Sequence, residues 1–491
     1  MKERKTGIII NGFHGAEYEP FLHDVLDRFA VAYCELLYSD AFSTPKNVTL
    51  TAHDLQRITW GDYDVDWNDV IPLDAPLVES MSECEVVVLR MMDRIEHIRE
   101  LKYAERKSIY LAHLRYWNHC LGKNSIDLFL SSNIPHEVYD YVIYCLCRLR
   151  GVKTLFFHQS LTVPDSVFLI DDWKDSMKEI KVRYQDLKDD GAPAVELNET
   201  YEAYFQSQVS SDGDAVPFYM RRDTNGKTAV LLTRMRGKFV RLKSMSIHER
   251  RGKILEFLSR SSYDRWMHSS LLKRNHRKLD QHYGDLSASP DLTKRYIYIA
   301  LHYQPELTSS PLAGIYVDQI LIAELLAACT PPDVLLYVKE HPKQGALSRD
   351  VSFYERLASI PSVRIVPKSF DSFDLITNSC AVATATGTVG WEALFREKPV
   401  LMFGSFFYQY ADGVCRIETE EDCREAMRRI FDGGLAPSMA DTRRFLRAVQ
   451  DTTIRAVADP AYGAISRISR EESHANLVEA LVDKWTAMGG Q

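Results

Sequence analysis

The stretch LLYVKEHPK (335–343) places a histidine and a proline directly after an apolar run that is typical of a buried strand. Glu340 and His341 would emerge at the end of this strand, and Pro342 restricts the backbone of His341 to extended geometry. In an open parallel sheet, ligands bind where the carboxyl ends of the strands meet. We therefore predict that His341 donates to a phosphate or a ribose; the alternative is that it only begins a surface turn.

A second stretch with possible chemistry is CAVATATGTVGWEALFREKPVLMFG (380–404), whose pattern predicts a strand, a short loop, a helix and another strand. Thr386, Gly387 and Thr388 lie where the loop enters the helix, so backbone N–H groups, hydroxyls and the helix dipole would favour an anion. Glu392 falls in the first helical turn, where a carboxylate can stabilise the helix or reach a ribose. The stretch lacks the G-x-x-x-x-G-K-[ST] pattern, which argues against an ATP-hydrolysing loop. A purely structural turn is the alternative.

The third stretch, YIYIALHYQPELTSSPLAGIYVDQ (296–319), predicts a buried strand followed by a long polar loop. Its candidate lining residues are Gln304, Glu306, Ser309 and Ser310. Long polar loops in this position commonly carry function.

Polar residues also follow the strands expected in the first part of the chain. These cleft candidates are Asn11, Gly12, His14, Asn133, His136 and His158. A general base needs a pKa near the working pH and direct reach to the acceptor hydroxyl, which histidine can supply. We take His14, His158 and Glu306 as the catalytic candidates, while Glu17 and Asp165 also qualify by type and each histidine could instead be structural.

Alternating strand-like and helix-like patterns predict an α/β protein with parallel sheets. The expected strands are 7–12, 84–90, 126–132 and 153–158, then 295–301, 333–339, 363–367, 380–384 and 399–404. A helix is expected at 136–150, stopped by Gly151. The predicted domains are an acceptor lobe (1–170), a helical, basic insertion (171–290), a nucleotide-sugar lobe (291–440) and C-terminal helices (441–491).

Charge and cysteine content limit the partners and the compartment. The 491 residues carry a net charge of −8, yet residues 219–278 contain 17 Lys or Arg and four acids. This block is either a solvated helical face or a dock for an anionic membrane surface; nucleic-acid motifs are missing from it. Nine cysteines without C-x-x-C spacing favour reduced thiols in the cytoplasm. We expect no metal site, since H-E-x-x-H spacing is missing and no Asp-x-Asp of the metal-dependent transferase type stands out.

LLYVKEHPK and TATGTVGWEALFREKPVLMFG together resemble the bacterial capsule polysaccharide biosynthesis family, which includes Kdo transferases, over roughly 290–425. The resemblance implies a GT-B fold with two Rossmann-like lobes, a nucleotide-sugar donor in the second lobe and no essential metal or cofactor. It implies that His341 and Pro342 contact the nucleotide. It also implies that Thr386, Gly387 and Thr388 contact its phosphate. Glu397, where a glycine is expected, departs from the family pattern and leaves the donor sugar open.

These observations predict a metal-independent glycosyltransferase of surface polysaccharide synthesis, cytoplasmic or peripheral at the inner membrane. CMP-Kdo or a related ulosonic acid is the suggested donor, and a glycan or glycolipid the acceptor. A nucleotide-sugar 2-epimerase of the same fold and an inactive glycan- or lipid-binding scaffold are the alternatives.

Overall fold

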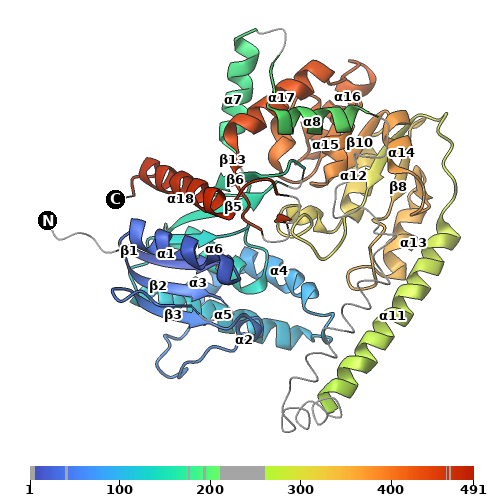
Figure 1. Ribbon diagram of the computed structural model, residues 1–491. Coiled ribbons are helices and arrows are strands. Elements are labelled where there is room, and N and C mark those ends of the chain that lie inside the picture. The colour runs from blue at the N-terminus through green and yellow to red at the C-terminus, as the bar shows by residue number, and fades with distance from the viewer. Residues whose placement is uncertain are drawn as a thin grey trace, which may run out of the picture.

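The structure is a computed structural model that describes residues 6–38, 42–160, 162–174, 177–191, 195–210, 260–459, 462–463 and 466–490. Two sheets form two lobes, which we call the N-lobe and the C-lobe (Figure 1). The part of the basic block at 219–259 lies outside the described residues.

The N-lobe sheet has seven strands in the order β13-β6-β5-β4-β1-β2-β3. The strands are Thr6–Asn11 (β1), Val31–Leu37 (β2), Thr49–His53 (β3), Leu128–Ser131 (β4), Lys153–Gln159 (β5), Ser166–Ile170 (β6) and Ile454–Arg455 (β13). β1 to β5 run parallel, whereas β6 is antiparallel to β5. The order 3-2-1-4-5 of the parallel strands is that of a Rossmann-like sheet.

The C-lobe sheet has six parallel strands in the order β12-β11-β10-β7-β8-β9. The strands are Tyr296–Ala300 (β7), Leu335–Lys339 (β8), Val363–Val366 (β9), Ala381–Thr384 (β10), Val400–Met402 (β11) and Val414–Arg416 (β12). The order changes direction between β7 and β10, and such switch points are where open α/β sheets bind ligands. Two Rossmann-like lobes confirm the predicted α/β, GT-B-like fold.

Helices cover both sheets, because their apolar stripes must be buried against the strands. Those of the N-lobe are Glu19–Arg28 (α1), Leu55–Ile58 (α2), Ala75–Ser80 (α3), Ser82–Met91 (α4), Tyr103–Lys123 (α5) and Val138–Arg150 (α6). Those of the C-lobe are Ile320–Cys329 (α12), Val351–Ser359 (α13), Ser372–Asn378 (α14), Thr388–Leu394 (α15) and Glu420–Phe431 (α16). The others are Lys178–Asp189 (α7), Glu199–Val209 (α8), Arg260–Leu286 (α11), Met439–Thr452 (α17) and Arg470–Ala487 (α18).

The end of the chain returns to the N-lobe. β13 pairs with β6, and α18 packs against α1 (Figure 1). α17 packs against α7, and its Phe445 also lies 5.9 Å from Trp391 of the C-lobe, measured between ring centroids. The C-terminal segment therefore contacts both lobes.

The strand predicted at 84–90 is wrong, because this segment forms helix α4. Cys84, Val88 and Met91 are its buried residues, while Val86 is 71% exposed. Burial at every third or fourth residue is helical, and the short apolar run alone does not distinguish a helix from a buried strand. The helix at 136–150 is confirmed as α6, which ends at Gly151 in the left-handed conformation (φ 70°).

All nine cysteines are free thiols. In the part of the chain that the structure describes, no helix is both long and apolar enough to cross a membrane.

Candidate active site

His341 is the second residue after β8, at the carboxyl edge of the C-lobe sheet, and is followed by the exposed Pro342. Its Nδ1 accepts a hydrogen bond from the backbone N–H of Lys343 at 3.2 Å, which places the ring proton on Nε2. Burial lowers the pKa of His341 to about 4, so the ring is neutral at physiological pH. A half-buried Nε2–H is thus available as a neutral donor at the strand end.

A buried ion pair fixes the loop that carries His341. Glu340 accepts from the backbone N–H of His341 at 2.6 Å, from Arg349 Nε at 3.0 Å and from the Tyr354 hydroxyl at 2.8 Å. Both charged side chains are fully enclosed. Arg349 also donates to Gln304 and to the backbone carbonyl of His302. Glu340 was predicted to contact the nucleotide-sugar donor. Its carboxylate oxygens instead accept hydrogen bonds from protein groups, and it holds the backbone of His341 in place.

His302, the second residue after β7, organises the loop after β10. Its Nε2 accepts from the backbone N–H groups of Ala385 and Thr386 at 3.1 and 3.2 Å and lies 2.9 Å from Thr384 Oγ1. Burial lowers the pKa of His302 to about 3, as expected for a ring that accepts these bonds in its neutral form. Gln319 holds the backbone of His302 through its side-chain amide.

The Thr/Gly loop uses part of its polar groups internally. The Thr386 hydroxyl donates to the Thr308 carbonyl at 2.7 Å, and the Gly387 N–H donates to Thr384 Oγ1 at 3.1 Å. Thr388 and Val389, both partly exposed, open α15, and the first N–H groups of a helix have no intrahelical acceptor. The anion site predicted from the sequence therefore has fewer donors than expected. The backbone N–H groups that remain to bind an anion are those of Thr388 and Val389.

Gly390 explains how α15 packs so closely behind this loop. A Cβ at this position would lie 2.6 Å from the Tyr408 hydroxyl and 3.0 Å from Thr384 Cγ2. The Tyr408 hydroxyl itself donates to the Gly387 carbonyl at 2.5 Å. Only glycine fits between the helix and these groups.

Glu392 lies one turn into α15 and is partly exposed, but protein atoms fill most of the space around its carboxyl group. Burial raises the pKa of Glu392 to about 7, while the Arg396 charge and a hydrogen bond from Thr388 act in the opposite direction. A carboxyl group with this pKa changes charge within the physiological range.

We expect nucleotide affinity to rise by about three- to fourfold between pH 6 and pH 8, because an ionised Glu392 accepts ribose hydroxyls more strongly by roughly 1 kcal/mol. Glu392→Gln should bind weakly and remove this pH dependence. Calorimetric titration of both proteins across this range is the measurement. An unchanged pH profile in the variant would exclude a ribose contact by Glu392.

The polar loop after β7 is folded on itself and against the N-lobe. Gln304 is buried and donates to the Val317 carbonyl at 2.7 Å. Ser309 Oγ donates to the Glu306 carbonyl at 2.8 Å, and the Ser310 carbonyl accepts from Arg94 of the N-lobe at 3.3 Å. Glu306 is exposed, yet the surrounding protein raises the pKa of its carboxyl group. Of the four predicted residues, Glu306 is the one whose side chain faces solvent.

On the N-lobe, the end of β1 is packed against β4 and α6. Asn11 Nδ2 donates to Ser131 Oγ and to Asp140 Oδ2, each at 3.2 Å. Gly12 has φ 82°, and a Cβ there would lie 1.9 Å from Ser132 Oγ. These two predicted residues therefore have clear packing roles. His14 lies beside Tyr38, with ring centroids 6.0 Å apart.

His158 is the most informative histidine of the N-lobe. It lies near the end of β5, is 2% exposed, and its Nδ1 is 2.9 Å from Asn133 Oδ1. Its Nε2 is buried and has no hydrogen-bond partner among the described residues. Burial, and then the neighbouring His136, lower the pKa of His158 to about 4. An enclosed acceptor nitrogen without a partner is costly, so a ligand hydroxyl would satisfy it.

Arg94 connects this histidine pair to the C-lobe. Its guanidinium lies 3.9 Å from Glu137 and donates to the Ser310 carbonyl, and it influences both His136 and Glu306 electrostatically. Arg94 Nε is buried without a partner in the described part of the chain. Arg94 thus lies near His136 of the N-lobe and Glu306 of the C-lobe, and His158 is a neighbour of His136.

Sequence reasoning did not single out His302, Arg349 or Arg94. His302 had a signal, since it follows a buried strand as His341 does. Arg349 and Arg94 had none, because each lies in an irregular segment or a helix end and gains its role only from partners far along the chain.

No group of three or more His, Cys, Asp or Glu side chains is arranged to hold a metal ion in the described ranges.

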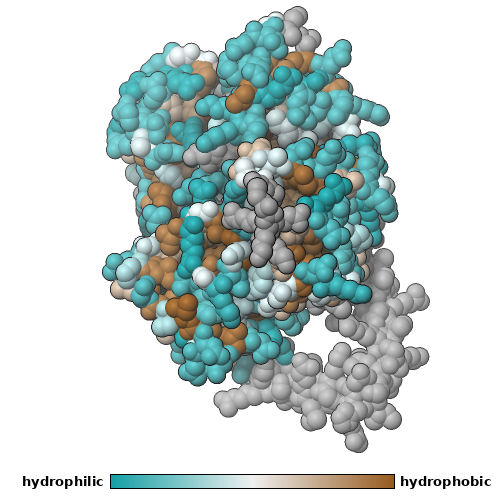
Figure 2. All heavy atoms as spheres, turned by 90° about the vertical axis from the view of Figure 1, so that its left-hand side faces the viewer, coloured by the Kyte–Doolittle hydropathy of each residue, from teal (hydrophilic) through white to brown (hydrophobic). Residues whose placement is uncertain are grey.

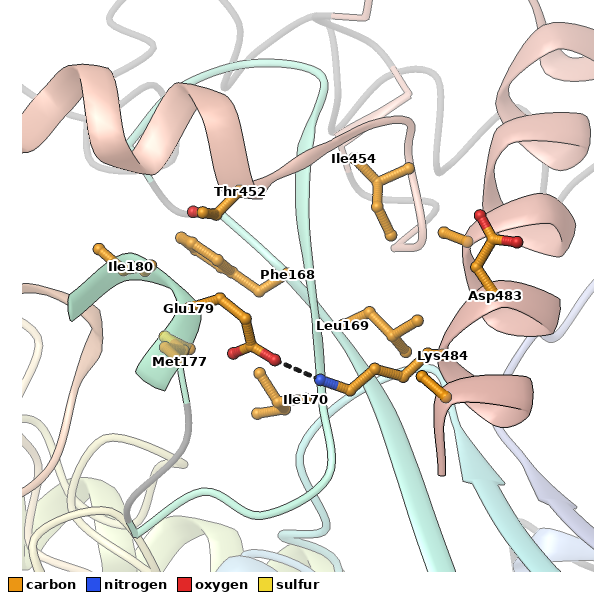
Figure 3. Close-up of a pocket in the computed structure, with 12 residues that line it drawn as sticks. Phe168, Leu169, Ile170, Met177, Glu179, Ile180, Thr452, Ile454, Asp483 and Lys484 are labelled. Atoms are coloured by element: carbon orange, nitrogen blue, oxygen red, sulfur yellow. Dashed lines mark hydrogen bonds and ion pairs between the residues drawn. The ribbon is translucent and has the colours of Figure 1, made fainter. Parts of the chain in front are cut away.

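A groove of about 400 Å³ lies elsewhere, between β6, β13, α7 and α18, and the Glu179–Lys484 ion pair spans it (Figure 3). Seen from the side of α1 and α18, hydrophobic residues gather near the middle of the surface (Figure 2). The groove shares no residue with the strand ends described above.

Part of the C-lobe matches a known protein family in sequence. Residues 316–442 match the model of the capsule polysaccharide biosynthesis protein family. The resemblance noted at LLYVKEHPK and the Thr/Gly loop is thereby confirmed over this segment, which runs from the loop after β7 into α17. No curated protein matches the chain.

Solved structures with similar architecture include a β-Kdo 2,7 transferase, KpsC, from Thermosulfurimonas dismutans (12% identity, TM-score 0.29, covering 81% of this chain and 96% of that one). The UDP-GlcNAc 2-epimerase of Methanocaldococcus jannaschii gives 10% identity and a TM-score of 0.26, with 91% and 100% covered. A UDP-forming α,α-trehalose-phosphate synthase from Burkholderia vietnamiensis gives 11% and 0.28, with 99% and 100% covered. At these TM-scores we draw no conclusion on activity from them.

Proposed function

We propose that this protein is a metal-independent glycosyltransferase that moves a sugar from a nucleotide-activated donor to a glycan or glycolipid acceptor in bacterial surface polysaccharide synthesis. The observation that carries the proposal is the group of ligand-binding features at one edge of the C-lobe sheet. His341 follows β8, and the α15 N-terminus and Glu392 follow β10, two strands away across the switch point. The family match at 316–442 covers all three.

On the donor side, His341 Nε2–H and the amides of Thr388 and Val389 would bind phosphate oxygens. When the bond between the sugar and the nucleotide breaks, negative charge develops on those oxygens. Fixed donors aimed at that charge lower the barrier without a metal ion. Because His341 is neutral, its contribution is a hydrogen bond rather than a full charge.

On the acceptor side, His158 would receive the proton of the acceptor hydroxyl. Asn133 accepts the Nδ1–H of His158, which leaves the lone pair of the buried Nε2 free to take a proton. An anion bound nearby would favour protonated His158 and raise its pKa from about 4 toward working pH. Glu306, exposed on the opposite lobe, is the rival base.

Arg94 suggests what kind of sugar the donor carries. A buried guanidinium with an unused Nε suits a carboxylate, which ulosonic acids such as Kdo possess and neutral hexoses lack. CMP-Kdo or a related donor is therefore our preferred substrate, and the enzyme would act at the cytoplasmic face of the inner membrane, where a glycolipid acceptor is accessible.

The test is to incubate the protein with CMP-Kdo, with and without a glycan acceptor, and separately with UDP-GlcNAc in the absence of any acceptor. Release of CMP, accelerated by added glycan acceptor, is expected from the first mixture, and unchanged UDP-GlcNAc from the second. Epimerised sugar in the second mixture would favour a 2-epimerase and contradict the transferase.

A further inference from the structure

Helix α11 is held firmly along one side. Leu279 and Tyr283 are buried in the core of the C-lobe, and the Tyr283 hydroxyl donates to the Val366 carbonyl at 2.6 Å. Leu272, two helical turns before Leu279, is partly buried. The His268 side chain forms a hydrogen bond of 2.6 Å with the Glu96 carbonyl of the N-lobe. At 3.6 residues per turn these residues share one face, so the helix presents a fixed opposite face.

The opposite face begins with large apolar side chains. Tyr263, Trp266 and Met267 are 58%, 63% and 40% exposed. Their spacing of three and four residues puts them on one stripe, turned away from Leu279 and Tyr283. Three such residues exposed within two turns is unusual, since large apolar side chains in clusters mark interaction sites.

The same face then becomes basic. Lys273, Arg274, Arg277 and Lys278 are all exposed, and the one acid between Tyr263 and Lys278 is Asp264. The next acid, Asp280, is bound to Lys368 at 2.6 Å and so does not neutralise this face. The positive charge stands out because the whole chain has a net charge of −8.

We propose that this outward face of α11, Tyr263 to Lys278, docks on an anionic lipid bilayer. Aromatic side chains prefer the headgroup level of a membrane, and flanking Lys and Arg side chains bind the anionic headgroups. α11 runs along the C-lobe with its N-terminal end away from the sheet, so the aromatic end can enter the interface without moving the lobes (Figure 1). The inference goes beyond the proposed transfer reaction, and its test needs neither donor nor acceptor.

The experiment is sedimentation of the full chain with vesicles of phosphatidylcholine alone, or mixed equally with phosphatidylglycerol. We expect binding to the mixed vesicles only, weakened by salt. Arg274→Gln/Lys278→Gln should reduce the affinity by about thirtyfold, from two lost headgroup charges. Trp266→Ala should reduce it by roughly tenfold, through lost apolar burial.

Matched controls separate docking from net charge and from folding. Arg424→Gln/Arg428→Gln removes two exposed arginines four residues apart on α16, and Tyr103→Ala removes an aromatic that is 68% exposed on α5. Neither should alter vesicle binding, and circular dichroism should show that all variants are folded. Equal binding to both vesicle types, no binding to either, preferential binding to duplex DNA, or an equal loss in the controls would overturn the proposal.

Discussion

Replacing Arg349 with methionine is expected to lower the free energy of unfolding of the C-lobe by about 3–5 kcal/mol. Arg349 and Glu340 are 1% and 0% exposed, so the variant would leave a carboxylate buried beside Tyr354 without its cation. For a lobe of this size, the melting temperature should fall by roughly 10 °C. Differential scanning calorimetry measures the shift.

The same lobe contains a matched control. Arg356 pairs with Glu324 at 3.0 Å, but both side chains are exposed, at 60% and 44%. Arg356→Met should cost less than about 1 kcal/mol, because solvent screens exposed pairs. Adding Glu340→Gln to Arg349→Met should restore part of the stability by removing the uncompensated charge. Equal effects of the two arginine variants would show that the buried pair does not support the His341 loop.

His158→Gln is expected to lower kcat for sugar transfer by about 10²–10⁴-fold while leaving donor affinity unchanged. Glutamine keeps the side chain polar and nearly the same length, but it cannot take a proton at neutral pH. The lost group would be the buried Nε2, whose lack of a partner suggested the role. Initial rates and nucleotide titrations of the variant provide the two readouts.

Glu306→Gln and His14→Ala serve as comparisons for His158. If Glu306 is the base, its variant shows the large loss and His158→Gln does not. His14→Ala should have little effect on kcat. His14 lies beside Tyr38, the residue after β2, and is not among the charged groups that influence Arg94. A large kcat loss in the His14 variant alone would move the acceptor site to the end of β1.

The C-lobe could be predicted closely from the sequence, because its strands are continuous apolar runs bounded by turn residues. The five strands expected there are β7 to β11. The N-lobe was less accessible. β2 (VAYCELL) and β3 (TLTAH) mix polar residues with apolar ones, and the buried Glu35 of β2 pairs with His53 of β3 at 2.6 Å. A pairing of this kind leaves no local pattern.

The candidate site was predictable as an edge of the sheet but not as a set of contacts. His341, the Thr/Gly loop and Glu392 could be placed together from the parallel topology alone. The same reasoning could not show that Glu340 is occupied by Arg349 or that His302 takes the amides of Ala385 and Thr386. Those bonds depend on side chains from separate loops that meet only in the folded lobe.

Thermal shift with CMP, CDP, UDP, GDP and TDP tests the central claim, a nucleotide site at His341, most directly. One nucleotide should stabilise the protein selectively, since a ligand that binds only the folded state raises its melting temperature. His341→Ala should abolish most of that shift, whereas His341→Gln, which can donate from the position of Nε2, should keep more of it than His341→Asn. No shift with any nucleotide, or an unchanged shift in His341→Ala, would contradict the account.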